Sequence, residues 1–211
     1  MIVTSIKQQK KDKERYNIFI DGEFAFGLIM EDILYFKIKE GYEISEEKYN
    51  YIKDTVLYIK AQDTALKFLG YKMRTEKEVL RKLNDSGYDS DVTDRVIEFL
   101  EKYNYLNDLE YSKAYIRQCS KLNPKGRYAV RCKLRELGVK DGIIDKAFID
   151  EELNETKGAQ QLLEKKLKGN RKISFKEKRR LQEFLLRRGY SYDIIKEAFL
   201  DLEIKIDNSD I

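Results

Sequence analysis

Apolar residues recur along residues 61–202 in three runs of the same design. Each run has apolar positions four residues apart, then a glycine, then a second amphipathic stretch. This order predicts a helix, a turn at a glycine in the left-handed conformation, and another helix. Six positions keep a constant spacing of 51 residues: Gly87, Gly138 and Gly189; Val79, Val130 and Leu181; Leu83, Leu134 and Leu185; Val92, Ile143 and Ile194; Val96, Ala147 and Ala198; Ile97, Phe148 and Phe199.

A further helical stretch precedes each of these helix pairs: DTALKFLGYK, DLEYSKAYIRQCSK or GAQQLLEKKLK. The pattern therefore predicts a mainly α fold of three tandem three-helix repeats. We expect the repeats to stack into an elongated array, because one unit is too small to bury its own apolar face. The expected boundaries are 61–108, 109–154 and 155–211, with an acidic tail at the C-terminal end. Thr75 with Glu78 and Ser174 with Glu177 match capping boxes at the start of second helices.

Residues 1–60 follow a different pattern, which predicts a small β-rich segment with a helix. IVTSIKQ and RYNIFI resemble strands, and the pair Asp21-Gly22 between β-favouring runs predicts a type I′ hairpin turn. A two-residue turn would place Phe19 opposite Phe24 and Ile18 opposite Ala25. Both faces of this sheet would then be apolar, so we expect it to pack on the helical stretch LIMEDILYF and on the next helix.

The next helix is expected to begin after Ser45, which is followed by two glutamates that favour the positive end of a helix dipole. It should run to about residue 72, either as one helix or as two that break near Ala61. It would join the β-rich segment to the first repeat.

Composition narrows the function classes. No apolar run approaches the roughly 20 residues of a membrane span, and the opening MIVTSIKQQKKDKER lacks the features of a signal peptide. The two cysteines, Cys119 and Cys132, fit free thiols in a reducing cytosol and cannot form a CxxC metal site. Histidine is absent, which excludes His-based catalysis and His metal ligands. We expect a cytoplasmic protein without enzymatic activity or cofactor; an enzyme that uses carboxylates stays open as an alternative.

Charge is unevenly distributed along the chain, whose formal net charge is only +4. Residues 111–140 hold nine Lys or Arg and one acid, and residues 160–190 hold eleven against three, so each segment is +8. Residues 191–211 hold two Lys against six acids, a net of −4. The basic segments predict a surface for phosphates or for an acidic protein face. The alternative is ordinary solvated helix faces whose arginine stems cover apolar side chains.

Arginines of the two basic segments gather on the second helices of their repeats. Arg127, Arg131 and Arg135 lie along one side of their helix, about 90° from the apolar stripe, and this strip is expected to be the main contact. The full set of candidate partner- or nucleic-acid-binding residues is Lys121, Lys125, Arg127, Arg131, Arg135, Arg179, Arg180, Arg187 and Arg188.

Three stretches, ALKFLGYKMRTEKEVLRKL, KGRYAVRCKLRELGV and FLLRRGYSYDIIKEAF, resemble the RecX family of bacterial proteins that regulate the RecA recombinase. IFIDGEFAFGL resembles the N-terminal extension of Gram-positive members. The resemblance implies a non-enzymatic, negative modulator that binds in the groove of the RecA–DNA filament. There it would restrain ATP hydrolysis, strand exchange and the co-protease activity that triggers the SOS response. The resemblance supplies no catalytic residues. Under this function, replacing Arg127, Arg131 and Arg135 by glutamate is expected to abolish filament regulation and to leave the melting temperature nearly unchanged.

Two points stay open at this level. The protein is expected to act as a monomer, and direct contact with single- or double-stranded DNA is compatible with the basic segments. A stand-alone DNA-binding helical repeat protein is therefore the alternative, because a helix, a glycine turn and a helix loosely resemble a helix-turn-helix. That alternative predicts steep salt dependence without any partner protein.

Overall fold

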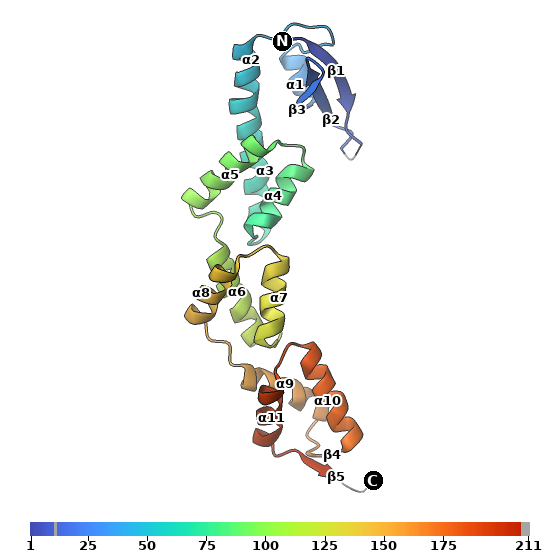
Figure 1. Ribbon diagram of the computed structural model, residues 1–211, viewed down its shortest axis with the longest axis vertical. Helices are drawn as coiled ribbons and strands as arrows, with labels where there is room; N and C mark the ends of the chain where they lie inside the picture. Colours follow the sequence, from blue (N-terminus) through green and yellow to red (C-terminus); the bar gives the residue numbers. More distant parts are fainter. Residues whose placement is uncertain (11, 208–211) are drawn as a thin grey trace. The chain divides into compact units, whose positions relative to one another are not determined.

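The computed structural model describes residues 1–10 and 12–207, and the chain divides into two units, Met1–Asn107 and Asp108–Ile211. A small antiparallel sheet opens the first unit, and three three-helix repeats follow along the chain (Figure 1). The predicted fold class is therefore confirmed. The end of the expected acidic tail, residues 208–211, lies outside the described residues.

Three antiparallel strands form the sheet in the order β1 (Val3–Gln8), β2 (Arg15–Ile20) and β3 (Glu23–Ile29). Asp21 and Gly22 both have positive φ, 50° and 89°, as a type I′ turn requires.

The predicted strand register is only half right. Phe19 lies opposite Phe24 as expected, but the pairing of Ile18 with Ala25 is wrong, because a register shift follows and Ile18 faces Phe26. The irregularity places two fully buried side chains, Ile18 and Phe26, in the core as a pair.

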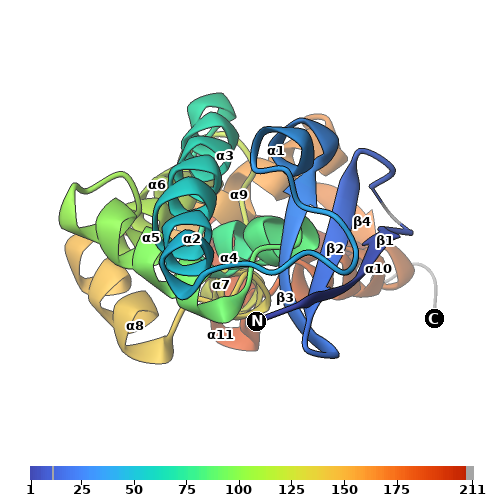
Figure 2. The ribbon, with the colours of Figure 1, turned by 90° about the horizontal axis from the view of Figure 1, so that it is seen from above.

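The sheet packs on α1 (Met30–Tyr35) and on a helical column of α2 (Glu46–Tyr51), the π-helical segment η1 (Ile52–Leu57) and α3 (Tyr58–Tyr71). Seen from above, the strands lie side by side next to this column (Figure 2).

The column begins after Ser45 as predicted, but its departure from α-helical geometry is not where the sequence suggested. The Ser45 hydroxyl accepts a hydrogen bond from the Lys48 backbone N–H. The helix does not break near Ala61, which is buried within α3; the departure from α-helical geometry lies earlier, in η1, where no Gly or Pro marks it.

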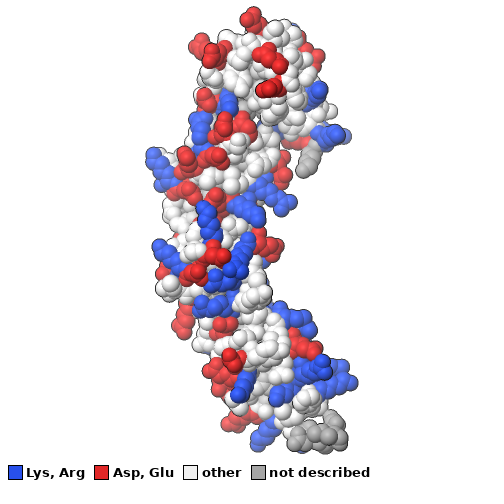
Figure 3. All heavy atoms as spheres, in the orientation of Figure 1, with Lys and Arg blue, Asp and Glu red and all other residues white. Residues whose placement is uncertain are grey.

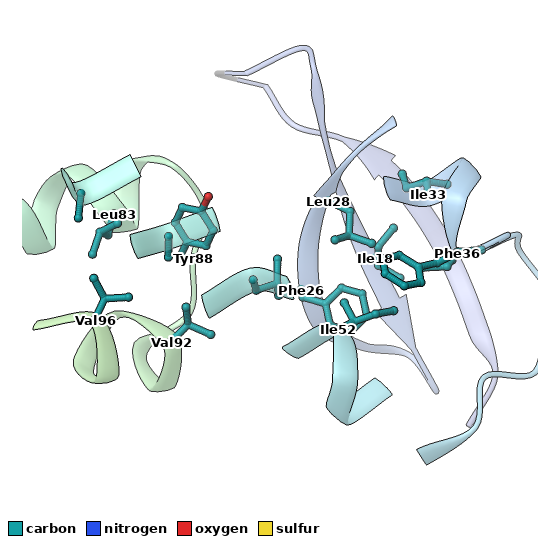
Figure 4. Close-up of a cluster of buried hydrophobic side chains, with 14 of the residues drawn as sticks. Ile18, Phe26, Leu28, Ile33, Phe36, Ile52, Leu83, Tyr88, Val92 and Val96 are labelled. Atoms are coloured by element: carbon teal, nitrogen blue, oxygen red, sulfur yellow. The ribbon is translucent and has the colours of Figure 1, made fainter. Parts of the chain in front are cut away.

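Repeat 1 consists of α3, α4 (Glu76–Asp85) and α5 (Ser90–Lys102), and it shares one hydrophobic core with the sheet. Arg15 of β2 links the two parts: its buried guanidinium donates to the Gly27 carbonyl (3.0 Å) and lies 4.7 Å from the ring centre of Tyr88. Figure 4 shows this continuous core, with labelled side chains Ile18, Phe26, Leu28, Ile33, Phe36, Ile52, Leu83, Tyr88, Val92 and Val96.

The second unit contains two repeats. Repeat 2 consists of α6 (Asp108–Lys121), α7 (Arg127–Glu136) and α8 (Asp141–Asp150). Repeat 3 consists of α9 (Glu155–Leu167), α10 (Phe175–Arg187) and α11 (Tyr192–Asp201).

Repeat 3 adds two short strands to the three helices predicted for it. Strand β4 (Lys172–Ser174) pairs in parallel with β5 (Lys205–Asp207). The pair forms because Ile173, in the short connection before α10, is buried in the core of the repeat and holds its backbone extended.

Equivalent positions of the repeats have equivalent environments. Leu83, Leu134 and Leu185 are fully buried, and Gly87, Gly138 and Gly189 follow the second helices with φ of 79°, 93° and 84°. The predicted 51-residue repeat is therefore confirmed. Both predicted capping boxes also form, at the starts of α4 and α10.

Repeats 2 and 3 meet through their main chains, and their hydrophobic cores are separate clusters of described residues. The Gly126 N–H donates to the Arg188 carbonyl at 3.0 Å. A Cβ at Gly126 would lie 2.0 Å from the Gly189 carbonyl oxygen, and one at Gly189 would lie 2.4 Å from the Ala129 nitrogen. Both positions therefore require glycine, and stacked apolar faces are not what joins these two repeats.

We expect Gly126→Ala to lower the free energy of unfolding by about 1–3 kcal/mol, because the added methyl group collides with main-chain atoms that cannot move independently. Urea unfolding measures the loss, and hydrogen exchange of the residue-126 amide should become faster. Gly142→Ala is the matched control: nothing lies within 4 Å of a Cβ there, and alanine is favoured over glycine in a helix. A Gly126→Ala variant as stable as the control would contradict the close backbone contact.

Candidate partner-binding surface

Two of the three arginines of α7, Arg131 and Arg135, face carboxylates of α8. Arg131 forms an ion pair with Asp145 and lies 3.7 Å from Asp141. Arg135 Nε donates to the same Asp141 carboxylate at 2.6 Å. This hydrogen bond, with the charges of both arginines, holds the pKa of Asp141 below its ordinary value. The predicted arrangement on one side is present, and its guanidinium groups are occupied.

Arg127 is held at the other end of α7. Its backbone N–H donates to Glu155 Oε1 at 2.8 Å, its Nε lies 3.9 Å from Glu155 Oε2, and its guanidinium lies 4.4 Å from the ring centre of Phe148. Arg131 also lies over Phe148, at 5.8 Å. The two guanidinium groups thus help to cover a core aromatic side chain of repeat 2.

Acidic residues neutralise the whole α7 face. Lys133, the remaining cation of α7, pairs with Glu136 at 2.9 Å. Each basic side chain of α7 therefore has a carboxylate partner on α7, α8 or α9. That Asp141 and Asp145 face these arginines could not be predicted from the sequence, because it depends on how α8 folds back on α7.

Lys125 and Lys121 differ in their surroundings. Lys125 Nζ donates to the Tyr115 hydroxyl at 2.8 Å, next to Cys119. Burial raises the pKa of Tyr115 to about 12 and also raises the pKa of the Cys119 thiol. Burial of Cys119 therefore disfavours its reactive thiolate form; both cysteines are free, and Cys132 is exposed. Lys121 is exposed, and its side chain has no hydrogen-bond or ionic partner among the described residues.

The arginines of α10 present a different picture. Arg179 pairs with Glu183 at 3.1 Å, within the same helix. Arg180 and Arg187 are exposed, seven residues apart, and neither has a carboxylate partner in the part of the chain that the structure describes. Arg188 is partly buried and donates to Asn123 Oδ1 at 3.0 Å. In Figure 3 basic side chains gather over α10, whereas basic and acidic side chains alternate over α7 and α8.

Further cations, which were not candidates from the sequence, lie on α10 and at the end of α9, and they have no carboxylate partner among the described residues. Their charges were counted in the segment 160–190, but only the second helices were placed on a helical wheel. Counting carboxylates three or four residues away would have shown that most of them lack a local partner. They are Lys165, Lys166, Lys168, Lys176 and Lys178.

Residues 1–10 and 12–207 contain neither a metal-binding cluster nor a membrane-spanning helix. No group of three or more carboxylate or thiol side chains there is arranged to hold a metal ion. None of the helices there is long and apolar enough to cross a membrane.

Family models match this chain in four consecutive parts. The regulatory protein RecX N-terminal domain matches residues 1–45, and the first, second and third three-helix domains of RecX match residues 61–100, 107–147 and 155–199. The matches cover the sheet and all three repeats.

Individual proteins are similar over nearly the whole chain. The regulatory protein RecX of Clostridium botulinum (strain Eklund 17B / Type B) is 36% identical over 201 residues, 93% of each chain. That of Bacillus subtilis (strain 168) is 36% identical over 207 residues, 97% of this chain and 78% of the relative. A crystal structure of regulatory protein RecX has a TM-score of 0.62 and 25% identity, with 95% and 98% of the two chains covered. RecX from Lactobacillus salivarius gives a TM-score of 0.62 and 26% identity over 70% of this chain and 97% of that one.

The ion pairing on α7 can be tested through the pKa of Asp141. Because the pKa is depressed in the folded protein, this pairing stabilises the fold above the unfolded pKa and is lost as the pH falls through the folded pKa. Arg135→Gln should raise the pKa of Asp141 toward its ordinary value of about 3.9. Carboxyl carbon chemical shifts followed against pH measure it. Asp91, whose pKa is lowered by Lys53, should not change, and an unchanged Asp141 would argue against the pair.

Proposed function

The chain belongs to the RecX family of regulatory proteins, and from this premise we propose that it binds the filament of RecA on single-stranded DNA and restrains its activities. ATP hydrolysis, strand exchange and the co-protease activity that triggers the SOS response would all be lowered. The observation that carries the proposal is the match of all four RecX domains, in order, to the sheet and the three repeats. Regulation by binding needs no catalytic group, and the protein would act as a monomer in the cytoplasm.

The surface that we propose for this contact is the exposed side of α10. The cations of α7 are paired with carboxylates, so that face has little net charge to offer a partner. Arg180 and Arg187 have no such partners in the described chain and are exposed. A nucleoprotein filament carries the negative charge of its DNA, and unneutralised guanidinium groups attract it over roughly 8–10 Å at physiological salt. We therefore propose α10 as the main contact, in place of the α7 strip that the sequence favoured.

A second candidate function is DNA binding without a partner protein. The same unpaired cations favour it, because phosphate contacts need charge and no particular sequence. The two candidates differ in one respect: direct DNA binding should occur without RecA and weaken steeply with salt.

We expect this protein to inhibit RecA-catalysed, single-strand-dependent ATP hydrolysis, and Arg180→Gln with Arg187→Gln to weaken the inhibition. The concentration for half inhibition should rise about tenfold, equivalent to about 1.4 kcal/mol of binding free energy. The matched control, Arg127→Gln with Arg135→Gln, removes the same charge from α7 and should change the inhibition little. If only the α7 variant loses inhibition, the contact belongs to α7. If the parent protein does not inhibit, the proposed function is wrong.

The structure also gives an expectation for the triple glutamate variant of Arg127, Arg131 and Arg135 that differs from that of the sequence. The new carboxylates would face Asp141, Asp145 and Glu155, and like charges at ion-pair distance repel. We therefore expect a lower melting temperature for this variant, measured by circular dichroism. A melting temperature equal to that of the parent would contradict the pairing on α7.

A further inference from the structure

A hollow of about 440 Å³ lies within the second unit, between the loop after α6, the end of α9 and the end of α10. It belongs to the junction of repeats 2 and 3, where the Arg188 carbonyl accepts the Gly126 N–H. Its position is therefore set by main-chain contacts.

Four cations and no carboxylate line this hollow: Lys165, Lys166, Lys168 and Arg188. The carbonyl end of α9 favours lysines in its last turn, which accounts for part of the cluster. Arg188 comes from another helix, and its hydrogen bond to Asn123 Oδ1 fixes the guanidinium at the wall. The described residues offer its other N–H groups no acceptor. The hollow is thus complementary to a negatively charged group.

Apolar side chains also line the hollow, beside the cations. Leu162 and Phe184 line it, and Leu122 at its edge is 77% exposed. Lys166 Nζ and the Arg188 guanidinium lie over the Phe184 ring, 5.1 and 5.4 Å from its centre. These cations occupy the ring that a nucleic-acid base would need for stacking. Phosphate binding alone would use no exposed leucine, whereas an apolar side chain of a protein partner would pack on it.

We propose that this hollow, named here the α9–α10 groove, binds an acidic protein segment that carries an apolar side chain among its carboxylates. The carboxylates face Arg188 and the three lysines, and the apolar side chain packs on Leu122 and Leu162. The proposal rests on the proposed function in one respect: the segment would belong to a subunit of the regulated filament.

The first test compares binding to RecA filaments, assembled on poly(dT) with a non-hydrolysable ATP analogue, with binding to poly(dT) alone. Lys165→Glu with Lys168→Glu, and separately Leu122→Ser, should each weaken filament binding, by about tenfold and about threefold, in fluorescence anisotropy. Lys146→Glu with Lys157→Glu, which changes two exposed lysines of the same unit, should bind like the parent. Leu122 is exposed, so its replacement leaves the fold intact.

Three results would overturn the proposal. All variants binding filaments like the parent would mean that the groove is not used. A loss of poly(dT) binding by the lysine variant, with Leu122→Ser unchanged, would assign the groove to nucleic acid. The third result would be a failure of an acidic peptide to bind the α9–α10 groove.

The second test needs no RecA and so separates the groove from the proposed function. A synthetic peptide of alternating Asp and Leu should shift the methyl resonances of Leu122 and Leu162, and a peptide of Asp alone should do so more weakly. No shift with the Asp-Leu peptide would overturn the proposal. Failure of the parent to bind filaments, with the peptide shifts present, would instead overturn only the proposed function.

Discussion

Each repeat depends on one residue that can hold a positive φ between its second and third helices. Gly87, Gly138 and Gly189 supply it at no steric cost, so the third helix can fold back and bury its apolar stripe. In each unit such a turn also makes a docking contact. A Cβ at Gly27 of the sheet would lie 3.3 Å from the Gly87 carbonyl oxygen, and the Gly189 carbonyl lies against Gly126. A glycine at this turn therefore lets the chain fold back within one repeat, and it also lets the turn come close to the neighbouring element.

Charge shows how strongly three-dimensional context decides chemistry. Two segments of equal net charge in the sequence become a neutral face on α7 and an unneutralised one on α10. The difference arises because the carboxylates of α8 and α9 reach α7, whereas α10 has only Glu177, which caps its own helix, and Glu183. Exposed ion pairs contribute little to stability, about 0–1 kcal/mol each. Their larger effect here is on the field that a partner meets.

The features that could be predicted from the sequence are local. Capping boxes, the Asp21-Gly22 turn and the glycine turns each depend on residues within a few positions of one another. Three other features depend on residues that lie eight or more positions apart: the register shift beside Ile18, the pairing of β4 with β5, and the partners of Arg131. The same holds for the candidate site: helix periodicity placed the arginines on one side correctly, but their neutralisation needs the position of α8.

The contact between Gly126 and Gly189 depends on a glycine that only repeat 2 places directly before its second helix. The position one repeat after Gly126 is Glu177, and α10 begins before it, at Phe175. The Glu177 side chain also accepts the Ser174 backbone N–H there, so the surface that could receive another glycine turn is filled. Repeat 3 therefore offers no equivalent of the close backbone contact that Gly126 makes in repeat 2.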